Sequence, residues 1–212
     1  FAGIENVYNY PIFKKKNLHL VDAAKNFTEK NLNIKECSTE TKIFIDYSKI
    51  QNLRKDGYKN IILGIGSSGP TTKWGSENFI SLINELNNVG KFYFFLLCGP
   101  EEKKDAQKIL GEVNANNCES LADKSISQIK NYVAISDLYI GNDSFGQHLS
   151  CQMGKPSFII LLDTPRAYSD YSVNQKRIIP PNKNLDEITH DSKLDPNTIS
   201  VKLVINKIKD FI

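Results

Sequence analysis

The residues best suited to chemistry lie in one segment, Gly-Asn-Asp-Ser-Phe-Gly-Gln-His, at positions 141–148. The segment follows an apolar run and precedes a helical pattern, and the first N–H groups of a helix lack intrahelical partners and bind anions. It therefore predicts an anion site at Ser144 and Gly146. Asp143 and His148 are expected within reach of the same ligand. The structural alternative is that Asp143 or Ser144 only caps the helix and that His148 is a surface or half-buried residue.

A second polar segment, Gly-Ile-Gly-Ser-Ser-Gly-Pro-Thr-Thr-Lys-Trp-Gly, occupies positions 64–75 and also follows an apolar run. Its glycines allow a ligand to approach the backbone closely, its hydroxyls can bond to phosphate, and its lysine adds a positive charge. The spacing matches neither a Walker loop nor GxGxxG, so a plain loop with turn glycines stays open as the alternative. The candidate binding residues of this segment are Ser67, Ser68, Thr72 and Lys73.

A third segment, Cys-Gly-Pro-Glu-Glu at positions 98–102, places Glu102 after another apolar run. A carboxylate there can accept hydrogen bonds from ribose hydroxyls. Acidic residues in a first helical turn are also favoured by the helix dipole, and that structural interpretation is the simpler one for this segment alone.

These segments need a scaffold that brings them together, and the apolar pattern predicts one. Apolar runs typical of strands buried on both faces occupy residues 43–47, 60–66, 91–98, 137–142 and 157–162. Amphipathic helical patterns occupy residues 19–31, 76–89, 101–110, 125–135, 144–154 and 196–211. Helix caps are expected at Ser76, at Ser125 with Gln128, and at Asp195 before Pro196.

The alternation of strands and helices predicts a doubly wound parallel sheet, a Rossmann-like α/β fold. Such sheets bind ligands at the carboxyl ends of their strands, where all three polar segments fall. The polar, Lys- and Asn-rich residues 1–40 contain no complete strand–helix unit.

The composition argues against several classes of protein. The 212 residues are 40% hydrophobic and 24% charged, as in an ordinary globular domain. A net charge of +3 is too small to indicate nucleic-acid binding, but it is compatible with an anionic membrane surface. No membrane span or signal peptide is expected. The four cysteines lack CxxC spacing, so no metal site is predicted and a cytosolic compartment is the simpler interpretation.

Together the three segments resemble glycosyltransferase family 9, the lipopolysaccharide heptosyltransferases. In that family a Gly-Ser-Ser-like strand end precedes a Lys-x-Trp-Pro box, a Gly-rich strand end with Glu, and Asp-[Ser/Thr]-Gly-x-x-His-Leu. The residues that carry the resemblance are Ser67, Ser68, Lys73, Trp74, Glu102, Asp143, Ser144, His148 and Leu149. Their order and approximate spacing agree across residues 60–162, which is far more specific than any single motif.

Two departures from the family pattern bear on the site. Lys73 stands directly before Trp74, so Thr72 occupies the usual Lys position, and no Pro follows. The family's Gly after Asp-[Ser/Thr] is Phe145 here, with Gly146 one place later. A side chain at that position could narrow the approach to the phosphates or change the sugar accepted, so heptose is not assumed.

The resemblance implies a GT-B fold, in which two Rossmann-like halves enclose the active site, and this chain matches the C-terminal half. Residues 1–40 would end the acceptor half and form the interdomain crossover. Residues 41–195 would form the nucleotide-sugar-binding domain, and residues 196–212 a C-terminal helix. Lys73 and Asp143 would act in catalysis, while the general base would lie outside the chain and leave the chain inactive alone.

The implied reaction transfers a heptose-like sugar from an ADP-sugar to a lipid-linked or oligosaccharide acceptor such as lipopolysaccharide core. It would invert the anomeric carbon and use no metal or other cofactor. The implied location is cytoplasmic, with peripheral contact at the inner face of the inner membrane as an option. The implied donor-binding residues are Ser67, Ser68, Thr72, Lys73, Glu102, Asp143, Ser144, Gly146 and His148, and the backbone of residues 121–124 would face the base.

Alternatives from other classes stay open on the sequence. A non-catalytic nucleotide-binding or interaction domain could keep this architecture, although the polar residues are largely retained. An epimerase or a retaining transferase of the GT-B fold would usually carry Glu where this chain has Asp143. A Rossmann oxidoreductase would need a glycine fingerprint that the chain lacks. Fold alone does not separate these functions.

Overall fold

We describe the fold from a computed structural model that places residues 19–40, 43–190 and 192–212. Residues 1–18, which the sequence assigns to the end of an acceptor half, lie outside these ranges. Within them, six strands form one parallel sheet in the order β3-β2-β1-β4-β5-β6, which confirms the predicted doubly wound sheet. The strands are β1 (Lys59–Gly64), β2 (Phe92–Leu97), β3 (Cys118–Ser120), β4 (Leu138–Asn142), β5 (Ser157–Ile160) and β6 (Gln175–Ile178).

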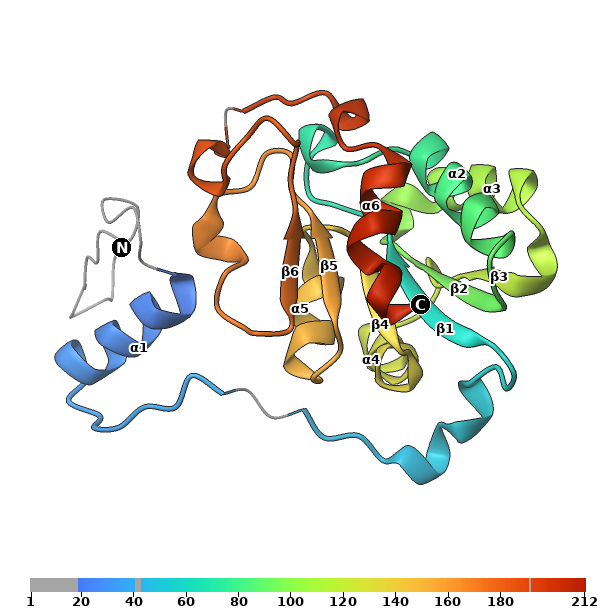
Figure 1. The fold of residues 1–212 in the computed structure, drawn as a ribbon. Coiled ribbons are helices and arrows are strands. Elements are labelled where there is room, and N and C mark those ends of the chain that lie inside the picture. The colour runs from blue at the N-terminus through green and yellow to red at the C-terminus, as the bar shows by residue number, and fades with distance from the viewer. Residues whose placement is uncertain (1–18, 41–42, 191) are drawn as a thin grey trace.

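Helices cover both faces of this sheet (Figure 1). The helices of the described residues are α1 (Leu20–Asn31), α2 (Ser76–Asn87), α3 (Lys103–Glu112), α4 (Ile126–Ile135), α5 (Phe145–Gln152) and α6 (Val201–Ile208). Short 3-10 turns lie at Tyr47–Lys49, Gln51–Leu53, Pro70–Thr72, Pro100–Glu102, Ala115–Asn117, Arg166–Tyr168, Leu185–Glu187, Pro196–Thr198 and Lys209–Phe211. No helix among the described residues combines the length and the apolar character that crossing a membrane requires.

Each layer of helices packs against one face of the sheet, because successive side chains of a strand point to opposite faces. Ile61 and Leu63 of β1 pack into the core under α2, α3 and α6, whereas Ile62 between them packs into the core under α4 and α5. Successive side chains of a strand point to opposite faces, so a strand covered on both faces must be apolar throughout. This is why the continuous apolar runs identified β1, β2, β4 and β5. α1 lies apart from the sheet, to one side of it (Figure 1).

A buried tryptophan fixes the loop that leaves β1. The Trp74 side chain is fully buried, and its indole N–H donates to the carbonyl of Ile199 at 2.8 Å. Its backbone N–H donates to the buried amide of Asn142 at 2.9 Å, and that amide in turn donates to the carbonyl of Ile65. These bonds tie the strand ends of β1 and β4 together. Gly141 is required there, since a Cβ at this position would lie 2.4 Å from the carbonyl oxygen of Gly64.

Several predicted elements are corrected by the structure. Residues 43–46 form no strand, because Phe44 is 82% exposed and the segment runs outside the sheet. Strands β3 and β6 were not predicted, since β3 has only three residues and β6 carries two half-exposed basic residues. The helix predicted from residue 101 begins as a 3-10 turn and becomes α-helical at Lys103.

Of the predicted helix caps, one is confirmed and two differ in the structure. The predicted capping box at Ser125 is confirmed, with Gln128 bonded back to it. Ser76 is not a cap, because Gly75 takes the N-cap position with a φ of 94°. The last predicted helix is broken: Asp195 caps only the turn Pro196–Thr198, and α6 starts afresh after Ser200.

Candidate functional site

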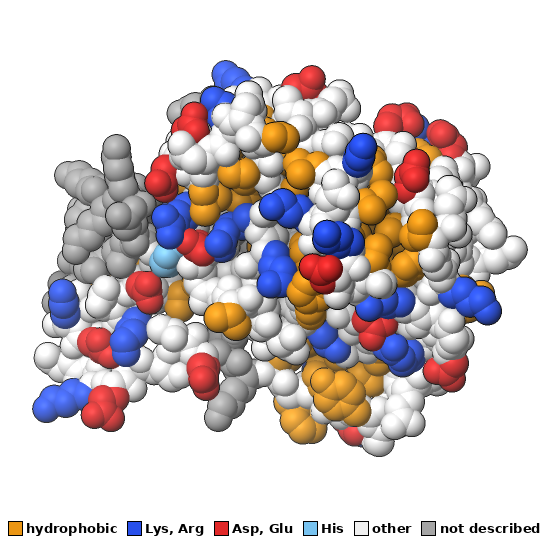
Figure 2. Space-filling view, viewed as in Figure 1, with side chains coloured by type: hydrophobic (Ala, Val, Ile, Leu, Met, Phe, Trp, Pro, Cys, Tyr) orange, Lys and Arg blue, Asp and Glu red, His pale blue; other side chains and the backbone are white. Residues whose placement is uncertain are grey.

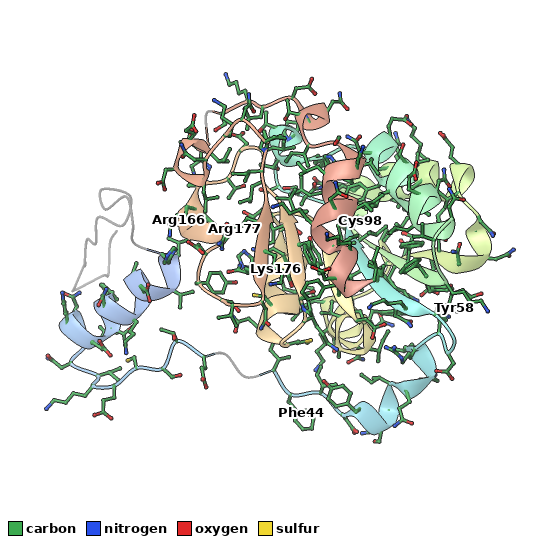
Figure 3. The ribbon with its side chains drawn as sticks, viewed as in Figure 1. Phe44, Tyr58, Cys98, Arg166, Lys176 and Arg177 are labelled. Atoms are coloured by element: carbon green, nitrogen blue, oxygen red, sulfur yellow. The ribbon has the colours of Figure 1, made fainter. Side chains whose placement is uncertain are left out.

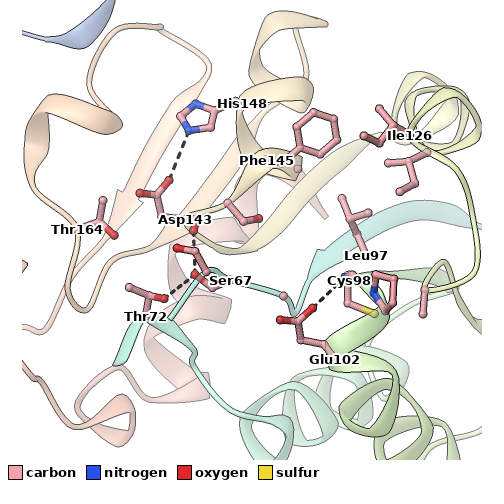
Figure 4. Close-up of a pocket in the computed structure, with 18 of the residues that line it drawn as sticks. Ser67, Thr72, Leu97, Cys98, Glu102, Ile126, Asp143, Phe145, His148 and Thr164 are labelled. Atoms are coloured by element: carbon pink, nitrogen blue, oxygen red, sulfur yellow. Dashed lines mark hydrogen bonds and ion pairs between the residues drawn. The ribbon is translucent and has the colours of Figure 1, made fainter. Parts of the chain in front are cut away.

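A cleft of about 770 Å³ opens at the carboxyl end of the sheet. It lies over β1, β2, β4 and β5, where the strand order reverses between β1 and β4. This reversal is the usual ligand position in doubly wound sheets, because the loops on either side of it diverge. Figure 4 shows the residues that line the cleft, drawn from all three polar segments.

Eight of the nine predicted binding residues line this cleft: Ser67, Ser68, Thr72, Glu102, Asp143, Ser144, Gly146 and His148. They come from segments up to about eighty residues apart, and the parallel sheet brings them together as its topology requires. Lys73 is the exception: it does not line the cleft, and its ammonium lies 3.1 Å from the carboxylate of Glu102, which does.

Glu102 is held from two sides. Its side chain is 10% exposed, accepts a hydrogen bond from the backbone N–H of Gly99 at 3.0 Å, and pairs with Lys73. The ammonium of Lys73 and the N–H of Gly99 replace part of the solvent that this buried carboxylate has lost. Glu102 can therefore offer an oxygen to a hydroxyl group in the cleft.

Asp143 is equally buried, with its side chain 8% exposed, yet it has no cationic partner of this kind. Its Oδ1 accepts a hydrogen bond from the Gln147 amide at 2.8 Å and lies 3.9 Å from Nε2 of His148. Burial raises the pKa of the Asp143 carboxyl, while His148 and hydrogen bonds from Gln147 and Thr164 oppose that rise. The carboxylate is thus surrounded mainly by neutral donors.

The buried side-chain amides of Gln147 and Gln175 hold Asp143 in place. Gln147 is fully buried, and its side-chain oxygen accepts a hydrogen bond from the Gln175 amide at 2.9 Å. Gln175 accepts in turn from the backbone N–H groups of Tyr171 and Ser172. The carboxylate therefore depends on the segment before β6, which the sequence did not connect with it.

His148 is half-buried and turned toward Asp143 (Figure 4). Burial lowers the pKa of its imidazole, an effect that the Asp143 carboxylate opposes. The lowered pKa makes the neutral ring the main form at neutral pH. The other ring nitrogen, Nδ1, lies 2.5 Å from the hydroxyl of Tyr171.

The start of α5 is arranged as predicted, but the capping alternative is not supported. Ser144 takes the N-cap position, yet its side chain makes no capping hydrogen bond. Ser67 links the first and third segments by donating to the carbonyl of Asp143 at 3.2 Å. Gly146 is required by packing as well, since a Cβ there would lie 2.4 Å from Leu97. The first N–H groups of α5 therefore face the cleft without a side-chain cap.

Further lining residues were not found from the sequence. Asp163 and Thr164 directly follow the apolar run at 157–162, so the rule that ligands bind at strand ends could have identified them. Tyr168 ends a short 3-10 turn and His190 lies in a loop, and no local sequence pattern marks either residue. The opposite wall is apolar and is formed by Leu97, Ala122, Ile126, Ile129 and Phe145.

Comparison with known proteins agrees with this architecture. The model of glycosyltransferase family 9 (heptosyltransferase) matches residues 5–194, which is most of the chain. The chain belongs to this family. The resemblance inferred from the three strand ends is thereby confirmed.

The family 9 chain is 28% identical over 195 residues to lipopolysaccharide heptosyltransferase 1 of Campylobacter coli. That alignment covers 88% of this chain and 56% of the Campylobacter protein. The chain thus spans little more than half the length of this curated relative.

Two solved structures share the fold. The E. coli heptosyltransferase WaaC with ADP is 19% identical, with a TM-score of 0.70 over 93% of this chain and 58% of that one. The family 9 glycosyl transferase of Veillonella parvula is 17% identical, with a TM-score of 0.71 over 93% of this chain and 61% of that one. The predicted Rossmann-like fold of the GT-B transferases is confirmed.

Proposed function

We propose that this chain binds the donor in a family 9 transfer reaction, in which a heptose-like sugar passes from ADP to a saccharide such as lipopolysaccharide core. The observation that carries the proposal is the convergence of eight predicted binding residues on one cleft, at the start of a helix without a side-chain cap. The relative from Campylobacter coli is named a lipopolysaccharide heptosyltransferase, and the E. coli relative was solved with ADP.

The leaving diphosphate is assigned to the start of α5. It gains negative charge as the glycosidic bond breaks, and helix N–H groups stabilise such charge without reorganising. Ser67 and Ser68 lie beside this helix terminus, and the neutral imidazole of His148 can donate one more hydrogen bond. Asp143 would repel a diphosphate, so we assign it to the hydroxyls of the sugar.

The nucleoside is assigned to the other side of the cleft. Glu102 is the acceptor for the ribose hydroxyls, because its charge is balanced and its side chain lines the cleft. The base packs against the apolar wall beside residues 121–124. Lys73 is proposed to act by holding Glu102, since direct contact with a phosphate would require it to leave that carboxylate.

We further propose that the transfer inverts the anomeric carbon and needs no metal. Among the described residues, no three His, Cys, Asp or Glu side chains are grouped in a way that could hold an ion. The charge of the leaving group would instead be met by the helix terminus, the hydroxyls and His148. The oxocarbenium character expected at the sugar suits a nearby carboxylate, and Asp143 provides it.

The remaining parts of the proposal concern the whole enzyme. Residues 41–195 are the donor-binding domain, residues 1–40 lead in from an acceptor half, and residues 196–212 close the domain. The general base belongs to that acceptor half. The enzyme acts on the cytoplasmic side of the inner membrane, and the Lys and Arg side chains gathered over β6 and α6 (Figure 2) suit contact with anionic lipid.

Calorimetry with ADP-heptose, followed by a transfer assay with a lipopolysaccharide-core acceptor, tests the proposal. We expect the 212-residue chain to bind the donor and to transfer nothing. UDP-glucose serves as the control donor and should bind more weakly. Failure to bind any ADP-sugar would overturn the donor site, whereas transfer by this chain alone would overturn only the placement of the general base.

A further inference from the structure

The segment that joins β5 to β6 supports two side chains of the cleft, Asp143 and His148. Its backbone holds Asp143 through Gln175 and Gln147, and its Tyr171 hydroxyl contacts His148 directly. The segment is itself anchored by ion pairs of Asp170 with two arginines, which lie side by side in Figure 3. Charged as well as uncharged contacts therefore hold the segment next to the site.

We propose that Tyr171 fixes His148 in the tautomer that carries its proton on Nε2, so that an N–H donor faces the ligand in the cleft. Tyr171 is thus a positioning residue, and its importance for catalysis rests on the proposed function. The geometry of the two rings carries this inference.

The Gln152 side chain also bonds to the Tyr171 hydroxyl, but this contact lowers the pKa of Tyr171 and is therefore one in which Gln152 donates. Two other neighbours could accept the hydroxyl proton. Nδ1 of His148 lies 2.5 Å away and the sulfur of Cys151 lies 3.5 Å away. The Cys151 thiol donates to the carbonyl of His148 at 3.3 Å, and a sulfur is the weaker acceptor of the two. Burial raises the pKa of Tyr171, so the hydroxyl keeps its proton and donates it to Nδ1.

A neutral imidazole that accepts at Nδ1 must carry its hydrogen on Nε2. The nearest protein acceptor for that hydrogen is Oδ1 of Asp143, at 3.9 Å, which is too far for a hydrogen bond. Nε2–H is therefore not bonded to Asp143, and it can donate to a ligand oxygen that approaches from the cleft. This is the donor that an anionic diphosphate requires.

The other groups around His148 do not select a tautomer. The amide nitrogen of Gln147 lies 3.0 Å from both ring nitrogens. A point equally close to both can only sit above the ring face, because in the ring plane it would collide with the carbon between them. Tyr168 and His190 line the same cleft but contact each other rather than His148.

Nitrogen-15 NMR of the imidazole rings tests the assignment on the chain without ligand. The chain has only three histidines, and comparison with His148→Gln identifies the signals of His148. We expect a pyridine-like shift at Nδ1 and a pyrrole-like shift at Nε2. The opposite pattern in the wild-type chain would overturn the proposal outright.

Tyr171→Phe supplies the second test. We expect a mixture of tautomers and an imidazole pKa that rises by roughly half to one unit, because a hydrogen bond to the neutral ring is lost. Tyr168→Phe is the matched control and should leave the His148 signals unchanged. A His148 tautomer and pKa that are unaffected by Tyr171→Phe would contradict the proposal.

Titration with ADP-heptose separates this inference from the proposed function. With unchanged melting, Tyr171→Phe should weaken binding by about twofold to tenfold. If the NMR result holds but the wild-type chain binds no ADP-sugar, the tautomer assignment stands and the proposed function fails. If the donor binds normally but the wild-type His148 ring carries its proton on Nδ1, the proposed function stands and the tautomer assignment fails.

Discussion

Two carboxylates at the carboxyl end of the sheet are buried to the same degree but have different partners. Glu102 pairs with the ammonium of Lys73, so the fold balances its charge. Asp143 has the amide of Gln147 and the imidazole of His148, and burial raises its pKa. Glu102 therefore has a cationic partner before any ligand binds, whereas Asp143 has mainly neutral partners until a ligand contacts it.

The largest effect is expected on the Asp143 side of the comparison, at His148. His148→Ala removes a hydrogen bond to an anionic ligand, worth roughly 1.5–3 kcal/mol, and should weaken ADP-sugar binding about tenfold to a hundredfold. Calorimetric titration measures the loss. Lys108→Ala, outside the cleft and away from the residues that support it, is the control and should bind normally. Equal affinities for wild type and His148→Ala would place the ligand elsewhere.

A smaller effect is expected on the Glu102 side, and it concerns stability. In a double-mutant cycle of Lys73→Met and Glu102→Gln, we expect a coupling energy of about 1 kcal/mol from urea unfolding. The estimate is moderate because the Lys73 side chain is 29% exposed and partly screened. The exposed pair Lys103–Asp123 is the control, with little coupling expected. A coupling no larger than in that pair would remove the contrast between the two carboxylates.

The pH dependence of stability gives a third and still smaller difference. Because the pKa of Asp143 is raised in the folded state, its contribution to the free energy of unfolding is fully present below the ordinary pKa of 3.8. That contribution is lost as the pH rises through the pKa of the folded state. Asp143→Asn should therefore gain stability relative to wild type as the pH rises from acid toward neutral. Melting temperatures of both proteins between about pH 4 and 7 measure this trend. The opposite trend would show that the fold stabilises the carboxylate, and a constant difference would show that the fold does not raise its pKa.

Removal of divalent metal ions is expected to have no effect on ligand binding. Since neither carboxylate is proposed to hold a metal, ADP-sugar affinity should be the same with and without EDTA. Calorimetry in the two buffers makes the comparison. A requirement for magnesium or manganese would contradict the assignment of the diphosphate to the helix terminus and its neighbours.

The same contrast explains what the sequence could predict. The strand ends at residues 64–75, 98–102 and 141–148 were identified because buried parallel strands are continuously apolar and end abruptly in polar residues. The topology then fixed their convergence without any knowledge of side-chain contacts. The family resemblance rested on the same segments, so the failure to predict the edge strands β3 and β6 did not affect it.

The parts that were missed depend on contacts between distant side chains. The pairing of Lys73 with Glu102 joins residues 29 positions apart, and the bond between Gln147 and Gln175, which supports Asp143, joins residues 28 positions apart. No local periodicity encodes such contacts. Strand β6 was missed for another reason, since its two half-exposed basic residues give it no apolar pattern.

The central claim, that Asp143 serves a ligand rather than the fold, is tested most directly by Asp143→Asn. Asn keeps the shape and can still accept the hydrogen bond of Gln147, but it removes the charge. A melting curve and an ADP-heptose titration of the same variant are needed together. The account predicts a melting temperature equal to or slightly above wild type and an affinity weaker by about tenfold or more. A variant that melts early and binds normally once folded would show that Asp143 is structural.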